Sequence, residues 1–423
     1  PDFPVKNLIA EVTYNEGLPE IYQFPVAFVS LNHEKLLEEL PEKGKISQIT
    51  LGNEEGLLVD AVHVPEFREF LFYNLQKGKT IKSGKEAMVF EKGKTAPDGD
   101  IEEVSSRLIE TRRSNTSIIY DHRYFLKLYR RLDSTINPDA EISQFLTETV
   151  QFDNTPQYMG SIRYKTPRNS DPVLGMMQDL VTNTGTAWEN AKDAAHRYIE
   201  RVETSNIPEV PKFNTESRLE KLTFEELIER DQELVDSLLP QRISLLGQRS
   251  AEMHQALASH KNLKGFEHEA FSLHYQRSLY SSLQSLSRET FENLKKSIPS
   301  LPEGIQQEAE AVLERKNEVS ECFKRVFDHK LDTVKIRTHG DYHLEQLLWT
   351  GKDYIIINFE GEPTRPFSER RILRSGLRDV ASMIRSLHYA AYTPFMQINY
   401  ADEYRESDLE HWAELWFYYM TRF

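Results

Sequence analysis

One short stretch near the C-terminal end of the sequence constrains the fold and chemistry of the chain more than any other. Residues 339–346 read HGDYHLEQ, which places an isolated acid, Asp341, five positions before an amide, Gln346. A glycine beside an acid predicts a loop rather than a helix or a strand. A lone HGD is also common turn chemistry, so its interpretation depends on the residues C-terminal to it.

Residues 354–360 predict a strand with polar groups at its end. They read YIIINFE, and the two-residue period of a strand puts Asn358 and Glu360 on one face and the apolar residues on the other. The intervening TGKD at 350–353 is turn-like, so the two stretches are predicted to form a hairpin.

An acid, an amide five residues later and an oxygen-rich strand end are typical of a phosphoryl-transfer site. In such a site the acid, which here is Asp341, accepts or orients a hydroxyl proton. The amide and strand-end oxygens hold magnesium on the nucleotide phosphates, which makes Gln346, Asn358 and Glu360 the candidate metal ligands.

Length and composition exclude several classes of protein. A chain of 423 residues allows two or three domains, and no apolar run is long enough to span a bilayer. A net charge of −15 argues against nucleic acid as the main partner. A single cysteine, Cys322, excludes an internal disulfide and favours a reducing, cytoplasmic location. The chain begins at Pro1 without methionine and stops in an aromatic run, so we expect a fragment of a longer polypeptide.

The order of patterns predicts three regions. Residues 1–104 alternate short strand-like runs with polar turns and predict a small α+β cap, succeeded from 105 to 181 by a second strand-rich unit. Residues 182–423 are mainly helical and contain the loop at 339–346 and the strand at 354–360. Within them, residues 270–298 and 302–327 predict a helical hairpin interrupted by prolines.

A lysine in the second region indicates an anion site. Lys127 lies within the apolar strand YFLKLY, where a charge is costly unless it meets an anion, although an edge strand facing solvent would also accept it. Glu141 comes next, in a predicted helix that starts near Pro138. A strand lysine paired with a helix glutamate is the arrangement that orients nucleotide phosphates in kinases.

Two further segments are candidates for nucleotide contacts. The hydroxyl and amide groups of Ser114, Asn115, Thr116 and Ser117 stand where a glycine-rich phosphate loop is expected. Residues 173–181 predict a buried strand that is either ordinary core or the hinge that contacts adenine through its backbone, with Gln178 and Leu180 as the hinge candidates.

Candidates for substrate contacts lie in the C-terminal half. Residues 377–387 predict a helix whose buried stripe is Val380, Met383, Ile384 and Leu387. Its other face, with Arg378, Asp379, Ser382 and Arg385, either lines a polar pocket or stabilises the helix by charge. The remaining candidates share polar or aromatic character: His343, Tyr389, Tyr392, Trp412 and Trp416, of which the two tryptophans fit ordinary helix packing at least as well.

Taken together, these segments resemble the bacterial maltokinases, especially those fused to or partnered with trehalose synthase. The resemblance covers essentially the whole chain and is densest from about residue 105, in FLK around Lys127, in HGDYHLEQLL, in IINFEGEPTRP and in LRDVASMIRSLHYAA. It implies an α+β, bilobal fold of the eukaryotic-like kinase or aminoglycoside-phosphotransferase type, with an N-terminal cap on the small lobe.

The implied activity is phosphorylation of maltose by ATP at the anomeric hydroxyl, with Mg²⁺, to give maltose 1-phosphate for α-glucan and glycogen synthesis. The resemblance assigns the catalytic base to Asp341, phosphate positioning to Lys127 and Glu141, and a metal ligand to Gln346. Family members usually carry aspartate where this chain has Asn358, a neutral acceptor without charge to offer. Glu360 on the same strand face is the candidate replacement. Native divergence with Glu360 compensating, an engineered loss-of-activity change and a weakened kinase all fit Asn358, and each predicts reduced magnesium affinity.

These departures leave two alternatives open. The neutral Asn358 also fits a catalytically impaired, pseudokinase-like form or a module that binds a trehalose synthase partner. A phosphotransferase for another small alcohol is the second alternative, and the FEGEP and LRDVA runs argue against it.

Overall fold

The computed structural model describes residues 5–17, 19–96, 101, 103–109, 115–167, 171–205, 220–397 and 403–423, without the side chains of 395, 397 and 403–408. Contacts divide the chain into two units. The first comprises Pro1–Ser259, His339–Ile372 and Leu377–Phe423, and the second comprises His260–Thr338 and Leu373–Gly376. No helix among the described residues is both long and apolar enough to cross a membrane.

The first unit begins with an antiparallel sheet in the order β1-β2-β4-β3, with a short strand β10 also paired to β2. Its strands are β1 (Val5–Val12), β2 (Glu20–Ser30), β3 (Lys45–Leu51), β4 (Glu54–Asp60) and β10 (Arg131–Leu132). The short helices α1 (Glu34–Glu39), η1 (Glu42–Gly44) and η2 (Ala61–His63) connect them. Gln23 is buried, and its Nε2 donates to the carbonyls of Tyr129 and Leu174 at 2.5 Å each, so β2 is fastened to the neighbouring sheet.

That second sheet has seven strands in the order β5-β6-β11-β12-β9-β8-β7. They are β5 (Thr80–Ser83), β6 (Glu86–Lys92), β7 (Ser106–Ile109), β8 (Asn115–Tyr120), β9 (Tyr124–Tyr129), β11 (Tyr158–Lys165) and β12 (Val173–Asp179). The predicted boundary at residue 104 is therefore wrong, because β5 and β6 belong to the sheet that carries Lys127. One hydrophobic core joins both sheets and α2 (Pro65–Gln76).

The hairpin predicted around Lys127 is present as β8 and β9. Asp121 and His122 in its turn have φ of 47° and 53°, the left-handed values that tight hairpin turns require. The register pairs Ser117 with Lys127 and Asn115 with Tyr129. Asn115 to Ser117 thus form the start of a strand rather than the loop that was predicted, and Ser114 lies outside the described residues.

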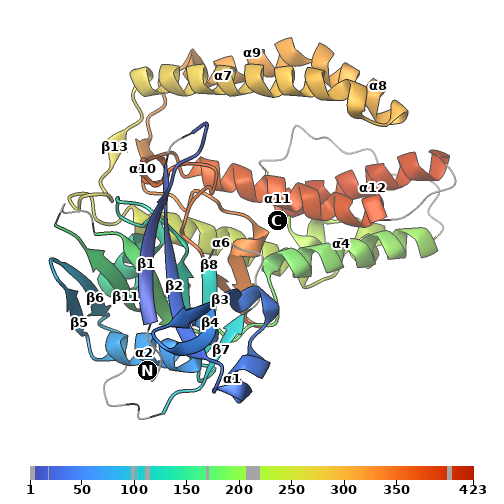
Figure 1. Cartoon of the computed structure of the whole chain (residues 1–423). Helices are drawn as coiled ribbons and strands as arrows, with labels where there is room; N and C mark the ends of the chain where they lie inside the picture. Colours follow the sequence, from blue (N-terminus) through green and yellow to red (C-terminus); the bar gives the residue numbers. More distant parts are fainter. Residues whose placement is uncertain are drawn as a thin grey trace. The chain divides into compact units, whose positions relative to one another are not determined.

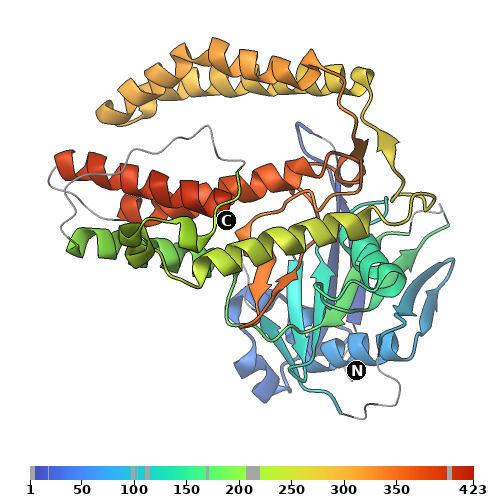
Figure 2. The same ribbon diagram turned by 180° about the vertical axis from the view of Figure 1, so that it is seen from behind.

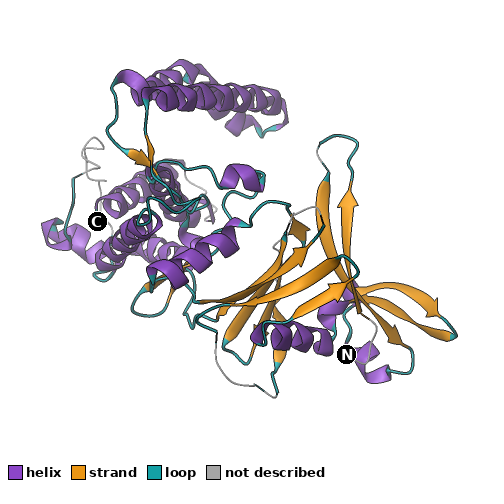
Figure 3. Ribbon diagram, turned by 90° about the vertical axis from the view of Figure 1, so that its left-hand side faces the viewer, coloured by secondary structure: helices purple, strands orange, loops and turns teal. Residues whose placement is uncertain are grey.

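Helices form most of the rest of the first unit, and in Figure 3 most of them lie apart from the two large sheets, whereas α2 packs against the strands. The helical elements are α3 (Pro138–Gln144), the π-helical turn η3 (Phe145–Val150), α4 (Ala187–Thr204), η5 (Phe224–Glu226), α5 (Glu229–Leu234), α6 (Leu239–Leu257), α10 (Phe367–Arg370), α11 (Leu377–Gln397) and α12 (Glu403–Arg422). Helices α4, α11 and α12 lie side by side (Figures 1 and 2). Trp412 and Trp416 are buried in this packing, so the alternative that they line a pocket is wrong.

The predicted buried stripe of α11 is only half correct. Met383 and Leu387 are buried, whereas Val380 and Ile384 are 36% and 41% exposed. The helix instead turns Asp379 inwards, where it is 1% exposed. A polar residue takes the core position because it accepts hydrogen bonds from the backbone of the loop at 339–340.

The second unit contains the predicted helical hairpin. It is built from α7 (Leu273–Ser297), η6 (Ile298–Ser300), α8 (Glu303–Glu314) and α9 (Lys316–Asp328), closed by the two-stranded pairing of β13 (Glu269–Ala270) with β14 (Val334–Lys335). Gln276 is fully buried in α7, and its Nε2 donates to the carbonyls of Val326 and His329 at 2.6 and 2.7 Å. Sequence analysis placed this hairpin in the large helical region and did not predict a separate unit.

Candidate active site

The loop that carries Asp341 is held from inside by Asp379. The backbone N–H groups of His339 and Gly340 donate to the two Asp379 carboxylate oxygens at 2.9 and 3.0 Å. His254 of α6 donates to the same carboxylate at 3.0 Å. Asp379 is thus a positioning residue, and its predicted role in binding substrate is wrong because both of its oxygens are occupied and buried.

Glycine is required at position 340. Its φ is +86°, and an added Cβ would approach the Cα of Gly361 at 3.4 Å. The HGD pattern therefore provides a left-handed backbone position, which glycine accepts without strain, while the approach to Gly361 would leave ordinary van der Waals contact.

His339 is a buried structural partner of the loop. Its Nε2 donates to the carbonyl of Ile357 at 2.9 Å, and its ring packs against Tyr342 and Phe359. Because a carbonyl only accepts, Nε2 carries the proton. Burial lowers the pKa of His339 despite the nearby carboxylates, so the ring is neutral and joins the loop to the second half of the hairpin.

Asp341 remains partly open to solvent and ionised. Burial alone would raise its pKa, but the neighbouring His343, with a smaller contribution from the charge of Arg370, holds the pKa below its ordinary value of 3.8. His343 Nε2 lies 3.7 Å from the Asp341 carboxylate and 3.0 Å from Gln346 Nε2. An ionised carboxylate with few fixed donors is suited to accept a proton from a bound hydroxyl.

Replacing Asp379 with asparagine is expected to destabilise the first unit by about 3 kcal/mol at pH 7, because the buried N–H groups and His254 lose their carboxylate. Burial opposes ionisation, but His254 and the loop N–H groups lower the pKa of Asp379 below 3.8. Its contribution to stability is therefore present above that value and lost as the pH falls through the lowered pKa. Urea unfolding of both proteins between pH 7 and pH 3 should show that the difference between their free energies of unfolding becomes smaller on acidification. A difference in free energy of unfolding that stays constant with pH would contradict the role of Asp379 as an ionised acceptor for the loop.

The predicted hairpin is present, but its second strand is shorter than predicted. Strands β15 (Leu347–Trp349) and β16 (Tyr354–Ile356) pair antiparallel, and Thr350 to Asp353 form the turn. The chain leaves the strand before Asn358, whose φ of 62° is left-handed. The strand therefore does not reach residue 360, and the shared strand face predicted for Asn358 and Glu360 is wrong.

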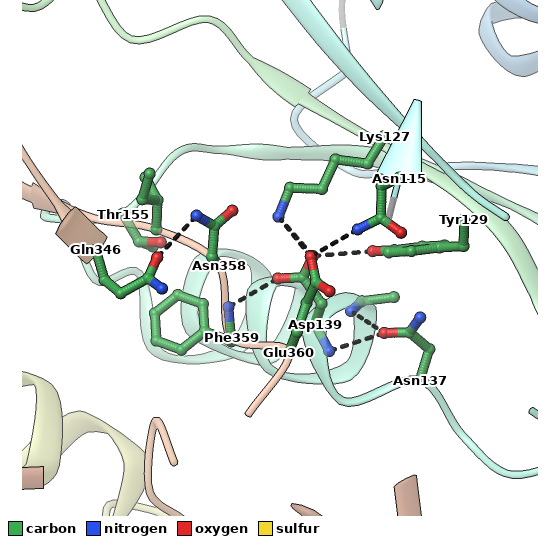
Figure 4. Close-up of polar contacts among 12 residues, drawn as sticks. Asn115, Lys127, Tyr129, Asn137, Asp139, Thr155, Gln346, Asn358, Phe359 and Glu360 are labelled. Atoms are coloured by element: carbon green, nitrogen blue, oxygen red, sulfur yellow. Dashed lines mark hydrogen bonds and ion pairs between the residues drawn. The ribbon is translucent and has the colours of Figure 1, made fainter. Parts of the chain in front are cut away.

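The turn still brings the predicted metal-binding groups together (Figure 4). Asn358 Nδ2 donates to Gln346 Oε1 at 2.8 Å, so the two amides separated by the hairpin contact each other directly. The Asn358 amide oxygen points the other way, towards the side of the site that holds Lys127.

Lys127 meets an anion, as its strand position predicted, but the partner is Asp139 rather than Glu141. Its Nζ lies 2.7 Å from the Asp139 carboxylate, and both side chains are almost fully buried. Asp139 also accepts from the Tyr129 hydroxyl and from the backbone N–H of Phe359, each at 2.9 Å. This carboxylate therefore ties strand β9 to the turn at Asn358 (Figure 4).

Local chain geometry explains why the nearer acid takes this place. Asn137 caps α3 by accepting from the N–H groups of Asp139 and Ala140, so Asp139 stands in the first turn of the helix. Glu141 lies two residues later, about 200° around the helix at 100° per residue. It binds Arg371 instead through two hydrogen bonds of 2.9 and 2.5 Å.

Glu360 lies beside the buried lysine. Its carboxylate accepts from Asn115 Nδ2 at 2.9 Å and lies 3.7 Å from Lys127 Nζ. Burial raises the pKa of Glu360, with the charge of Lys127 opposing and the charge of Asp139 reinforcing that shift. Two carboxylates thus share one lysine.

The donor set at this turn fits magnesium only in part. Mg²⁺ in proteins typically takes one or two carboxylates together with substrate phosphates and water. Glu360 offers one carboxylate, and Gln346 and Asn358 offer neutral amide oxygens. Among the described residues, no three or more His, Cys, Asp or Glu side chains form a ready-made metal cluster. A metal held here would therefore depend on nucleotide phosphates for most of its negative ligands.

The remaining candidates for nucleotide contacts are restricted by their own bonds. The Thr116 hydroxyl accepts from Arg130 Nε at 2.8 Å, and Ser117 is buried in β8. Gln178 is in the buried strand β12. The Leu180 N–H donates to the carbonyl of Arg123 at 2.8 Å, so of its backbone groups only the carbonyl stays a candidate for the adenine.

Of the predicted substrate contacts, His343 and Tyr389 line a hollow in this region, whereas Arg378 and Tyr392 have other partners. Arg378 Nη2 donates to Glu362 at 2.8 Å, and the ring of Tyr392 stacks on His388 at 4.6 Å. The hollow measures about 460 Å³. Its lining combines two aromatic side chains with polar groups: Trp188, His343, Glu345, Ser382, Arg385, Ser386, Tyr389 and Thr393.

Sequence analysis placed Ser382 and Arg385 on the candidate pocket face and considered His343 and Tyr389, but it missed the other lining residues, Trp188, Glu345, Ser386 and Thr393. Arg385 Nη2 donates to the Tyr389 hydroxyl at 3.0 Å, with the guanidinium 4.3 Å from the ring centre. The spacing of Ser382, Arg385 and Tyr389 along one exposed face of α11 was the available signal. Trp188 comes from α4, and no sequence pattern marked it as part of the hollow.

Comparison with known proteins supports this architecture. No protein-family profile matches the sequence. Among solved structures, glucosamine kinase in complex with glucosamine, ADP and inorganic phosphate is similar with a TM-score of 0.57 and 17% identity over 99% of this chain and 82% of that one. Two further crystal forms of glucosamine kinase give TM-scores of 0.58 and 0.57 at 17% and 16% identity, over 99% of this chain and 82% and 80% of theirs.

At these identities the likeness shows the fold alone. It confirms the predicted α+β, kinase-like architecture.

Proposed function

We propose that this chain is an ATP-dependent sugar phosphotransferase and that its acceptor is maltose, phosphorylated at the anomeric hydroxyl. The observation that carries the proposal is one continuous series of contacts. It starts at Asp341, passes through His343, Gln346 and Asn358, and continues from the Phe359 N–H through Asp139 to Lys127. A base, amide ligands and a phosphate-binding lysine are thereby fixed in one framework.

Each residue has a role that this geometry supports. Asp341 accepts the proton of the sugar hydroxyl. The hydroxyl oxygen of the sugar forms a bond to the γ-phosphorus while the bond between that phosphorus and the departing ADP oxygen breaks. Lys127 donates to phosphate oxygens, and Asp139 keeps its ammonium in place. Mg²⁺, when bound through Glu360 and the amide oxygens of Gln346 and Asn358, would neutralise charge on the phosphates. The hollow beside His343 offers aromatic and polar walls for a sugar.

The choice of maltose rests on the sequence resemblance, and the glucosamine kinases make glucosamine the rival acceptor. The partnership with trehalose synthase and the cytoplasmic location also rest on sequence reasoning alone and stay predictions.

A second candidate is a nucleotide-binding protein without turnover. It is favoured by one observation: the position expected to carry a metal-binding carboxylate holds the neutral Asn358, whose amide nitrogen bonds Gln346. Such a protein would bind ATP weakly through magnesium and transfer no phosphate.

The decisive experiment measures ADP release with maltose, trehalose, glucose and glucosamine at graded magnesium, for the natural chain and for Asn358→Asp. We expect maltose to give the highest kcat/KM. Because a carboxylate binds Mg²⁺ more strongly than an amide, we also expect Asn358→Asp to lower the magnesium concentration for half-maximal rate by about tenfold. Preference for glucosamine would overturn maltose but keep the sugar kinase. Activity only in Asn358→Asp would establish the impaired form, and silence in both folded proteins would exclude the proposed function.

A further inference from the structure

Glu360 occupies donors that a nucleotide phosphate would need. Its carboxylate takes the Asn115 amide at 2.9 Å and approaches Lys127 Nζ at 3.7 Å, so it contacts two adjacent strands, β8 and β9, at once. In Figure 4 the Lys127, Asn115 and Tyr129 side chains converge on the carboxylates of Asp139 and Glu360.

The two carboxylates are held differently. Asp139 is completely buried and bonds three groups of the framework, Lys127, Tyr129 and the Phe359 N–H. Glu360 has 29% of its side chain exposed and lies 3.7 Å from the lysine, against 2.7 Å for Asp139. Of the two anions at Lys127, Glu360 is therefore the one that an incoming ligand can displace.

A phosphate cannot share this position with a carboxylate. Two anions that compete for one lysine repel each other strongly in a partly buried site, where the effective dielectric constant is well below that of water. An unpaired carboxylate is in turn costly unless it gains a cation. The turn brings the amide groups of Asn358 and Gln346 but no charge, so a magnesium ion is the cation that would compensate the displaced carboxylate.

We propose that Glu360 is an internal competitor for the nucleotide: its carboxylate stands in for a phosphate on Asn115 and Lys127 in the free protein, and a nucleoside triphosphate displaces it towards the magnesium that accompanies the phosphates. This inference rests on the proposed function and adds the residue that links nucleotide binding to metal binding. It explains how a site with Asn358 still supplies a carboxylate, and only when nucleotide is present.

The test is the affinity for ATP measured by calorimetry, first in EDTA and then with magnesium, for the natural chain, Glu360→Gln and Glu360→Ala. Without magnesium, both variants are expected to bind ATP about tenfold more tightly, because the competing charge is gone. With magnesium the advantage should disappear or reverse. For each protein, the dissociation constant for ATP in EDTA divided by that with magnesium measures how strongly the metal assists nucleotide binding. This ratio should be at least tenfold smaller in the two variants than in the unsubstituted chain.

Glu369→Gln is the matched control, since it removes one negative charge from the same segment on a side chain that is exposed and bonds Arg365. It should leave both affinities within about twofold. Unchanged or weaker ATP binding in EDTA for the Glu360 variants would overturn the proposal, and Glu360→Ala decides the matter if Glu360→Gln does not fold. If ATP binds to none of the proteins, the proposed function fails as well. ATP binding without phosphate transfer would exclude the enzymatic activity, and the ATP affinities of the variants would then test the inference about Glu360 by themselves.

Discussion

Replacing Asp341 with asparagine is expected to lower kcat for sugar-dependent ADP release by about 10³-fold. The amide keeps the shape of the carboxylate but cannot accept the hydroxyl proton, and general-base catalysis typically contributes 10²–10⁴. The affinity for ATP and the thermal unfolding temperature should change little, because Asp341 lies partly in solvent, whereas the buried Asp379 holds the backbone of the loop.

The lowered pKa of Asp341 gives this prediction a second measurement. A base with a pKa below 3.8 stays ionised through the neutral range, so the titration of Asp341 itself should not reduce kcat/KM until the pH falls below that value. Steady-state rates from the acid limit of folding to pH 8 provide the check. Wild-type rates for Asp341→Asn, in protein that still binds ATP, would remove Asp341 from the mechanism.

The second large effect is expected at Asp139. Asp139→Asn leaves the ammonium of Lys127 buried without its main counterion, and removing one partner of a buried ion pair typically costs 3–5 kcal/mol. We expect a loss of stability of about 3 kcal/mol, because Glu360 compensates in part, and a fall of at least 10²-fold in kcat/KM for ATP because Lys127 is no longer fixed.

Glu141→Gln is the matched control for this experiment. It removes an acid from the same short helix and disturbs the pair with Arg371 rather than the contact with Lys127, so ATP-dependent kcat/KM should change less than fivefold. Denaturant unfolding and steady-state rates of the two variants measure both quantities. If Glu141→Gln has the larger effect on ATP, the pairing expected from the sequence would be the functional one, and the contact with Asp139 would be structural only.

Asp139 also marks the point where sequence reasoning stopped being sufficient. The cost of burying a charge in an apolar strand correctly predicted that Lys127 meets an anion. The next helix along the chain carries two acids in its first turn, and they point to different sides. Spacing along the chain cannot choose between them, because the choice depends on where the Asn358 turn lies relative to the helix.

The same distinction explains the other corrections. The polar face of residues 377–387 was predicted correctly, but two of its members have partners within the protein: Asp379 accepts from the loop at 339–340 and Arg378 donates to Glu362. A buried acid that caps backbone N–H groups and an exposed acid that binds a sugar look alike in sequence. Only the burial of the side chain and the identity of its donors separate them.

The features that the sequence determined by itself were those fixed by local chemistry. These are the α+β class, the hairpin from TGKD, the strand lysine and the loop in which glycine precedes the acid, because each depends on turn preference, strand period or the cost of burying a charge. The tertiary structure alone decided which acid pairs with Lys127, how far the second strand extends, that residues 80–92 join the small-lobe sheet and that Glu360 contacts Asn115. Those outcomes depend on contacts between residues far apart in the chain, and no local pattern encodes them.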